Sequence, residues 1–248
     1  MSRGATPRTM AAVAADGRSV AVTVRWAALD AIDPDGARAR CTPAERARAD
    51  RRATPVLRRR ALASLAARRL VVAEVLGADP SAVELLIATD GRRLAAGPSG
   101  QPVAISVSTC GAVGLVAAAP VGQLGADVED FGRVDPTPAF VARVASPTER
   151  LELDRLDPGA RAGALLRLWT RKEAYLKATG EGIGGGLGTV EVPLDPLCGG
   201  GWFDPRGDGV MWRCFGLVAP DEACTAALVI GGAGLDHDAA IELDVRAL

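Results

Sequence analysis

Two long helical segments, each followed by apolar strands, constrain the fold of this 248-residue chain. The first, Leu57–Leu76, places leucine and valine at the spacing that buries one helix face, and a glycine follows it. The second, Asp157–Thr179, starts with an N-cap residue and a proline, and it also ends at a glycine. The repeated order of helix and strands predicts an α+β fold with two similar subdomains that join near Pro120.

The remaining elements and the domain division follow from shorter patterns. The helical pattern of the first half starts at Ala44 and runs to Gly77, and Pro55 breaks or restarts it; a broken helix is also predicted over 136–156. Apolar runs bounded by turn residues predict strands at Val20–Trp26, Val83–Ala88, Val103–Val107, Val113–Ala118, Gln123–Asp130, Thr189–Val192, Val210–Val218 and Ala223–Ile230. We therefore expect a flexible leader over residues 1–18, an N-terminal subdomain over 19–120 and a C-terminal subdomain over 121–248.

Charge and residue usage exclude several classes of protein. A formal net charge of -1 gives no reason to expect a nucleic-acid or membrane partner. The chain has no apolar run long enough for a signal peptide or a membrane span. Five cysteines without CxxC spacing and one histidine, His237, argue against zinc sites, disulfide frameworks and histidine-based triads. We expect a cytoplasmic protein.

Two acidic residues follow the apolar part of the Gln123–Asp130 strand. Asp127 and Glu129 are two residues apart, so both side chains face the same side of the strand. Like charges at this spacing repel each other unless a cation lies between them, and Mg²⁺ prefers a few carboxylates together with phosphate oxygens. The alternative is an exposed strand edge whose acids face water.

The second long helix carries a stripe of functional residue types. Trp169, Glu173 and Lys177 are spaced i, i+4 and i+8, which places them on one face. Lys172 lies on a neighbouring face, and these two residues are the only lysines among 29 basic residues. Glu173 could lie beside a metal ion with Lys177 one turn away. The alternative is an ordinary amphipathic helix with a Glu173–Lys177 ion pair that contributes about 0.3–0.5 kcal/mol.

Together, Gly125–Glu129 and Trp169–Lys177 resemble the G-x-D-x-E strand and W-x-x-K-E-(A/S)-x-x-K helix of surfactin-type 4′-phosphopantetheinyl transferases, in the same order and at similar spacing. The resemblance covers roughly residues 45–230. It implies two α+β subdomains related by pseudo-twofold symmetry, with coenzyme A bound between them, and a monomer. It also implies transfer of the phosphopantetheine arm from coenzyme A to a serine of an acyl or peptidyl carrier protein.

The resemblance also implies a role for each matching residue. Asp127, Glu129 and Glu173 would hold Mg²⁺ against the pyrophosphate. Glu173 would take the proton from the carrier serine, directly or through water. Lys177 would neutralise charge as 3′,5′-ADP leaves, and Lys172 would contact phosphate. Such a reaction depends mainly on positioning and charge stabilisation.

One family motif is altered in this chain. The family has a strand that ends in Ser-His-Ser, and the matching residues here are Ser108, Thr109 and Cys110. The family histidine contacts a coenzyme A phosphate, and threonine can replace its hydrogen bond but not its charge. Nearby arginine could compensate: Arg92 is close to the position of a Gly-Lys-Pro contact loop in the family, although Gly100–Pro102 competes for that match. The alternative for Ser108–Cys110 is a simple strand end.

Two functional hypotheses follow from these matches. The first is an active Mg²⁺-dependent enzyme that modifies carrier proteins of polyketide, peptide or fatty-acid synthesis. The second is a catalytically weakened family member that binds coenzyme A or a carrier protein without efficient transfer, because Thr109 replaces the histidine. For coenzyme A we expect contacts from Ser108, Thr109, Lys172, Lys177 and Arg92.

Overall fold

The computed structural model describes residues 19–248 except 121, 134–135, 183, 185, 195–200, 221, 233–234 and 236–238. The expected leader, His237 and part of the glycine-rich loop after Thr179 lie outside the described residues. Among the described residues, none of the helices is both long and apolar enough to cross a membrane.

In the first half of the chain, the described residues form a strand, three helices and four further strands. Its elements are β1 (Ser19–Ala28), α1 (Pro34–Arg40), α2 (Pro43–Asp50), α3 (Pro55–Leu76), the 3₁₀ turn η1 (Pro80–Ala82), β2 (Glu84–Ile87), β3 (Arg93–Ala96), β4 (Pro102–Cys110) and β5 (Val113–Ala119). Each of the three helices has proline in its first turn and an N-cap side chain that accepts a backbone hydrogen bond.

The second half repeats the combination of helices and strands. Its elements are β6 (Gln123–Asp130), the 3₁₀ turn η2 (Phe131–Arg133), α4 (Pro138–Val144), α5 (Pro147–Arg155), α6 (Pro158–Thr179), the 3₁₀ turn η4 (Leu187–Thr189), β7 (Gly201–Phe203), β8 (Trp212–Leu217), β9 (Cys224–Gly231) and β10 (Ala240–Ala247). The predicted α+β class is confirmed.

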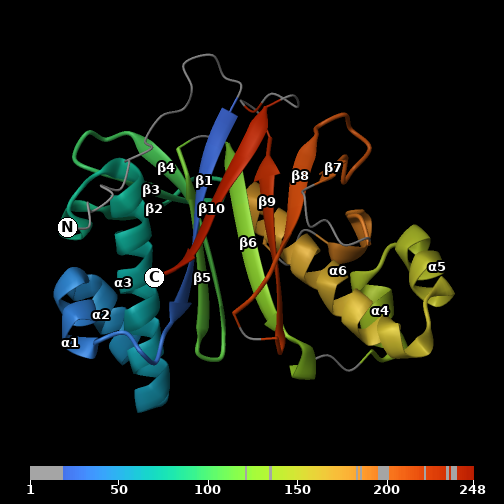
Figure 1. Cartoon of the computed structure of the whole chain (residues 1–248), viewed down its shortest axis with the longest axis horizontal. Coiled ribbons are helices and arrows are strands. Elements are labelled where there is room, and N and C mark those ends of the chain that lie inside the picture. The colour runs from blue at the N-terminus through green and yellow to red at the C-terminus, as the bar shows by residue number, and fades with distance from the viewer. Residues whose placement is uncertain are drawn as a thin grey trace, which may run out of the picture.

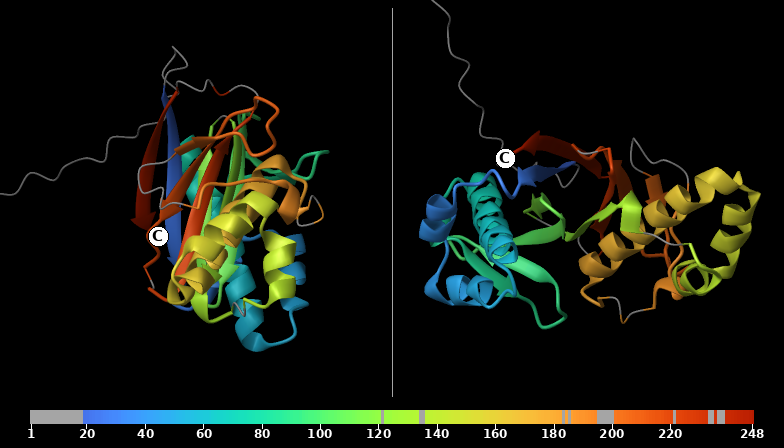
Figure 2. Two further views of the ribbon diagram at one scale, coloured as in Figure 1. Left: turned by 90° about the vertical axis from the view of Figure 1, so that its right-hand side faces the viewer. Right: turned by 90° about the horizontal axis from the view of Figure 1, so that it is seen from below.

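The strands form two sheets that lie between α3 on one side and α6 on the other (Figure 1). The strand order is β10-β1-β5-β4-β3-β2 in the first sheet and β6-β9-β8-β7 in the second. Figure 2 shows the same layers from below, with α4 and α5 beyond α6 at one end.

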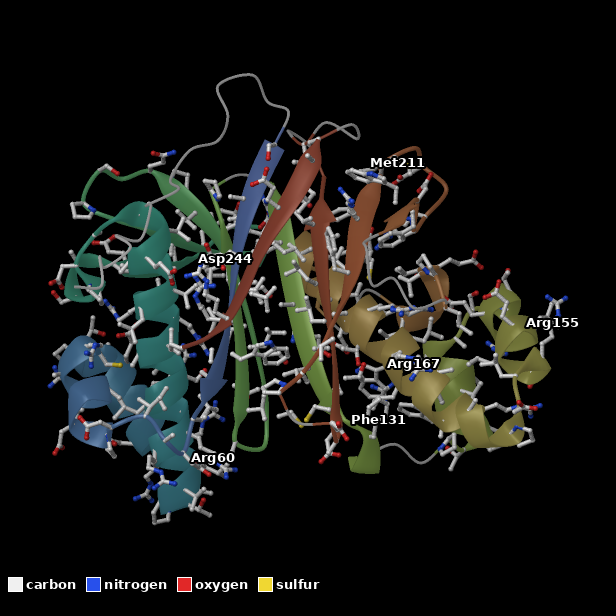
Figure 3. The ribbon with its side chains drawn as sticks, viewed as in Figure 1. Arg60, Phe131, Arg155, Arg167, Met211 and Asp244 are labelled. Atoms are coloured by element: carbon white, nitrogen blue, oxygen red, sulfur yellow. The ribbon has the colours of Figure 1, made fainter. Side chains whose placement is uncertain are left out.

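The last strand of the chain belongs to the first sheet. β10 pairs in parallel with β1 and so extends the first sheet, rather than lying with the other strands of residues 121–248. The buried guanidinium of Arg25 on β1 anchors β10, because the guanidinium binds Asp244 of β10 at 2.8 Å and also pairs with Glu74 of α3. Figure 3 marks the position of Asp244.

Side chains alternate between the two faces of each strand, so the two faces of a sheet pack into different hydrophobic cores. On β5, Leu115 and Ala117 pack in the core between the two sheets, whereas Val116 and Ala118 pack in the core against α3. On β6, Leu124 and Ala126 face the core between the sheets. The intervening residues Gly125, Asp127 and Glu129 therefore face α6, so the alternation of β6 directs both motif acids toward the helix that carries Glu173 and Lys177.

Gly125 allows α6 to lie directly against β6. A Cβ atom at this position would lie 1.7 Å from the carbonyl oxygen of Ala174 and 2.7 Å from the amide nitrogen of Ala178. Both neighbours are helix backbone, which cannot move aside by changing a rotamer. Glycine at the start of the G-x-D-x-E pattern is thus a packing requirement that brings the strand and the helix into contact.

The variant Gly125→Ala is expected to destabilise the protein by about 1–3 kcal/mol, because the added methyl group overpacks the contact between β6 and α6. Chemical denaturation would measure this loss. Gly159→Ala is a matched control, because a Cβ atom there would meet nothing within 4 Å. An unchanged midpoint for Gly125→Ala would show that the helix can move away from the strand without cost.

One predicted strand is wrong, and several elements were missed. The Thr189–Val192 segment forms the end of η4 and an extended connection instead of a strand. Its backbone is held by other partners: the Val192 amide donates to Glu149 at 2.9 Å, and the Glu191 amide donates to the Pro205 carbonyl at 2.9 Å. Among the described residues, the helices and strands that sequence patterns did not predict are α1, β3, β7 and β10, and the 3₁₀ turns were not predicted either.

Candidate functional site

Asp127 is the centre of the candidate site. Its side chain is 3% exposed although it carries a carboxylate. The Ser108 hydroxyl donates to Asp127 Oδ1 at 2.7 Å, and Lys177 Nζ lies 2.6 Å from the same oxygen. Lys177 also donates to the Ala126 carbonyl at 3.3 Å. Residues from β4, β6 and α6 therefore meet at one carboxylate.

Glu173 lies close enough to Asp127 for the two negative charges to repel each other. Burial raises the pKa of Glu173, the charge of Asp127 raises it further, and Lys177 and Arg143 partly oppose the rise. Glu173 Oε1 and Asp127 Oδ2 are both buried and have no hydrogen-bond partner. Two buried carboxylate oxygens without a donor are costly unless a cation satisfies them. Hard oxygen donors of this kind suit Mg²⁺.

Glu129 lies two residues beyond Asp127 on the same face of β6 and is half-buried. Among the described residues, no three side chains of the types His, Cys, Asp or Glu form a set that could hold a metal ion. The structure therefore brings Asp127, Glu173 and Lys177 together, and it does not bring Glu129 into one preformed set with the other two acids.

Lys172 occupies a different place from the one expected. Its side chain is fully buried, and its ammonium group donates to the carbonyls of Val144 at 2.8 Å and Leu187 at 2.9 Å. It also forms an ion pair of 2.5 Å with the buried carboxylate of Glu149. These three partners direct the ammonium into the protein, away from Asp127, so the phosphate contact expected of Lys172 has no support in this arrangement.

Thr109 lies on the side of β4 opposite to Ser108. It is exposed and lines a pocket of about 260 Å³ between β4, α2 and α3. Four of the side chains lining this pocket are arginines: Arg48, Arg52, Arg60 and Arg68. Figure 3 shows Arg60 near the lower end of α3. This concentration of positive charge is typical of a site for an anion.

Arg92 lies in the turn between β2 and β3, which contacts the end of α6. A Cβ atom on Gly180 would lie 2.3 Å from the carbonyl oxygen of Asp90 and 2.9 Å from the amide nitrogen of Arg92. The Arg92 guanidinium binds Asp90 at 2.7 Å. The turn thus places Arg92 beside the helix end that follows Lys177.

Some functional contacts had no clear signal in the sequence. The hydrogen bond between Ser108 and Asp127 joins strands of two different sheets. Glu149, which pairs with Lys172, lies 23 residues away from it in the chain. Ser146 and Glu149 do form the S-x-x-E pattern of a capping box, which the structure contains. That pattern predicts the start of a helix, but it does not predict that Glu149 pairs with the buried Lys172.

Comparison with known proteins identifies the family. Residues 123–203 match the model of the 4′-phosphopantetheinyl transferase superfamily. The chain is 30% identical over 193 residues to the 4′-phosphopantetheinyl transferase HetI of Nostoc sp., covering 77% of this chain and 78% of the relative. It is 28% identical over 202 residues to a phosphopantetheinyl transferase of Thraustochytrium sp., covering 77% and 70%. The chain belongs to the 4′-phosphopantetheinyl transferase superfamily.

A third relative, a Synechocystis sp. protein provisionally named as a 4′-phosphopantetheinyl transferase, is 30% identical over 172 residues, or 68% of each chain. The matched segment 123–203 contains β6 and α6, which supply Asp127, Glu173 and Lys177. This superfamily member is a transferase of the phosphopantetheine group, and its family implies coenzyme A and a carrier protein as partners.

Proposed function

We propose that this transferase moves 4′-phosphopantetheine from coenzyme A to a serine of an apo carrier protein in a Mg²⁺-dependent reaction of the surfactin type. The observation that carries the proposal is the pair of buried, unpartnered oxygens, Asp127 Oδ2 and Glu173 Oε1. Lys177 reaches only Oδ1 of Asp127, so these two buried oxygens still lack a partner, and a metal ion between them best explains the pair.

Asp127 and Glu173 would hold the ion, and Glu129 would join them from the same face of β6, directly or through water. Mg²⁺ usually keeps several waters and takes only one or two carboxylates besides substrate phosphate oxygens, so two preformed ligands are sufficient. When bound, the ion would supply charge neutralisation at the pyrophosphate of coenzyme A.

The side chains around the ion would move and stabilise charge. Glu173 would accept the proton of the carrier serine, and its raised pKa brings its basicity closer to neutral pH. The serine oxygen would then attack the β-phosphorus of coenzyme A, which carries the pantetheine arm, and 3′,5′-ADP would leave. Lys177 would orient Asp127 and stabilise the charge of the leaving group. Arg92, beside the end of α6, would contact phosphate.

The second candidate function is a weakened family member that binds coenzyme A or a carrier protein without efficient transfer. Thr109 favours this second function, because the family has a histidine at that position that contacts a coenzyme A phosphate, and threonine carries no charge. The arginines in the Thr109 pocket argue against it, since they provide positive charge on the same side of β4.

A transfer assay separates the two functions. The protein would be incubated with coenzyme A, Mg²⁺ and several apo carrier proteins, and each carrier would be weighed by intact-protein mass spectrometry. We expect one phosphopantetheine addition on at least one carrier. EDTA should stop the addition, and excess Mg²⁺ should restore it. If the protein binds coenzyme A but modifies none of the carriers, the result would favour a family member that binds its partners without efficient transfer.

A further inference from the structure

We infer that Gly91 and Gly180 are positioning residues for the transfer reaction. They allow the turn between β2 and β3 to touch the end of α6, and this contact holds Lys177 in place relative to Ser108 of the first sheet. The inference rests on the proposed function, because it takes the site around Asp127 as the place of transfer. It assigns a role to two backbone positions outside the motif segments Gly125–Glu129 and Trp169–Lys177.

The two glycines exclude a side chain because they lie against each other. A Cβ atom on Gly180 would lie 2.3 Å from the carbonyl oxygen of Asp90, and a Cβ atom on Gly91 would lie 2.7 Å from the carbonyl oxygen of Gly180. Both neighbours are backbone atoms, so no change of rotamer can make room. Alanine at either position must therefore push the turn and the end of the helix apart.

The turn is braced and cannot easily deform to accept a side chain. The Asp90 carboxylate accepts hydrogen bonds from the Arg92 amide at 3.1 Å and the Arg92 guanidinium at 2.7 Å. The Ala88 amide donates to the Arg92 carbonyl at 2.8 Å, and the Gly91 amide donates to the Ala88 carbonyl at 3.0 Å. The turn is thus expected to move as a unit with the strands that it joins.

The end of α6 is also held in place. The Gly180 amide donates to the Leu176 carbonyl at 3.1 Å and so closes the last turn of the helix. Beyond it, Glu181 forms an ion pair of 2.5 Å with Arg206, whose Nε donates to the hydroxyl of the buried Tyr175 at 3.1 Å. Because this second loop ties the helix end down, the helix cannot withdraw from the turn on its own.

The contact between the glycines closes a ring of interactions that passes through the candidate site. From the turn, β3 pairs with β4, and β4 carries Ser108. The Ser108 hydroxyl donates to Asp127, and Asp127 binds Lys177, which lies three residues before Gly180 on α6. A displacement where the glycines meet is therefore transmitted along the ring to the bonds around Asp127.

Transfer kinetics at saturating coenzyme A test this role. Gly180→Ala and Gly91→Ala should each lower kcat by about tenfold to a hundredfold, because misplacing catalytic groups by about 1 Å can cost that much. Gly77→Ala is the matched control for Gly180→Ala: both glycines end a long helix at a positive φ, but a Cβ atom on Gly77 would meet nothing within 4 Å. Gly209→Ala, at φ +82° with the same open space, is the control for Gly91→Ala at φ +87°. Both controls carry the cost of a left-handed alanine and should keep the wild-type kcat.

The double variant Gly91→Ala/Gly180→Ala separates this contact from two unrelated defects. It should lose no more kcat than the more affected single variant, because both substitutions break the same contact. If Gly180→Ala does not fold, Gly91→Ala gives the same test from the other side of the contact. A wild-type kcat in both single variants, or equal losses in the variants and their controls, would overturn the inference.

Hydrogen exchange gives a second readout that does not need transfer. The amide of Ala126 on β6 donates to the buried hydroxyl of Ser106 on β4 at 2.8 Å, so its exchange reports on the junction that the ring crosses. Gly180→Ala should speed exchange of this amide by about tenfold, and Gly77→Ala should leave it unchanged. If the wild-type protein modified no carrier, the proposed function would fail. The exchange rate would then decide the inference, and an unchanged rate in Gly180→Ala would overturn it.

Discussion

The variant Glu173→Gln should lose transfer activity and, at the same time, form a more stable metal-free protein. Glutamine fills the same space but cannot accept the serine proton, and removing a general base lowers the rate by about 10²–10⁴-fold. The same change removes a buried negative charge beside Asp127, whose repulsion helps to raise the pKa of Glu173. We expect the free energy of unfolding to rise by about 0.5–2 kcal/mol.

The pH dependence of this gain has a definite sign. A carboxyl group with a raised pKa stabilises the folded state when it is protonated, and this contribution is lost as the pH rises through the folded-state pKa. Wild-type protein therefore carries the penalty of the charged Glu173 at neutral and alkaline pH. The advantage of Glu173→Gln should be largest there and should shrink as the pH falls through the raised pKa.

Denaturant titrations of metal-free protein between acidic and alkaline pH would measure the gain, and mass spectrometry of a carrier would measure transfer. Glu152→Gln is the matched control, because Glu152 is an exposed acid of α5 and should affect neither quantity. Full transfer activity in Glu173→Gln would show that another group takes the proton. Unchanged stability at every pH would show that Asp127 and Glu173 do not repel each other in the free protein.

The two motif segments were predictable because their geometry is local. Residue alternation on β6 places Asp127 and Glu129 on one face, and helical spacing places Glu173 and Lys177 on one stripe. The structure then shows that Lys177 pairs with Asp127, 50 residues away, and not with Glu173 as an isolated amphipathic helix would suggest. That partner depends on the packing of α6 on Gly125, which no local pattern contains.

The features that were missed depend on contacts between distant segments. Apolar and charged residues alternate from Ile241 to Arg246, which is typical of a strand, but no local pattern shows that β10 pairs with β1 across almost the whole chain. The arginine pocket combines residues of α2, α3 and β4. The composition therefore indicated that the chain is rich in arginine, but not that several arginines line one pocket. The expected pseudo-twofold relation between subdomains and the expected monomer stay predictions.

Replacing Lys172 by methionine should destabilise the protein by about 3–5 kcal/mol, because it leaves the carboxylate of Glu149 buried without its cation. The ion pair also joins three segments, since the ammonium holds the carbonyls of Val144 and Leu187. Burial lowers the pKa of Lys172, which is the direction expected for a lysine enclosed by protein. Thermal and chemical unfolding would measure the loss.

The double variant Lys172→Met/Glu149→Gln separates a structural role from a phosphate contact. Glu149 also accepts hydrogen bonds from the Ser146 amide at 2.7 Å and the Val192 amide at 2.9 Å, on different oxygens, and an amide side chain keeps one acceptor for them. Removing both charges should therefore recover a large part of the stability, which gives a strong coupling energy between the two positions. A lysine that served coenzyme A would behave differently: Lys172→Met would keep its stability and lose affinity for coenzyme A, and Glu149→Gln would not rescue it. We expect the loss of stability in Lys172→Met and its recovery in the double variant, because the buried ammonium of Lys172 has no open side from which a phosphate could approach.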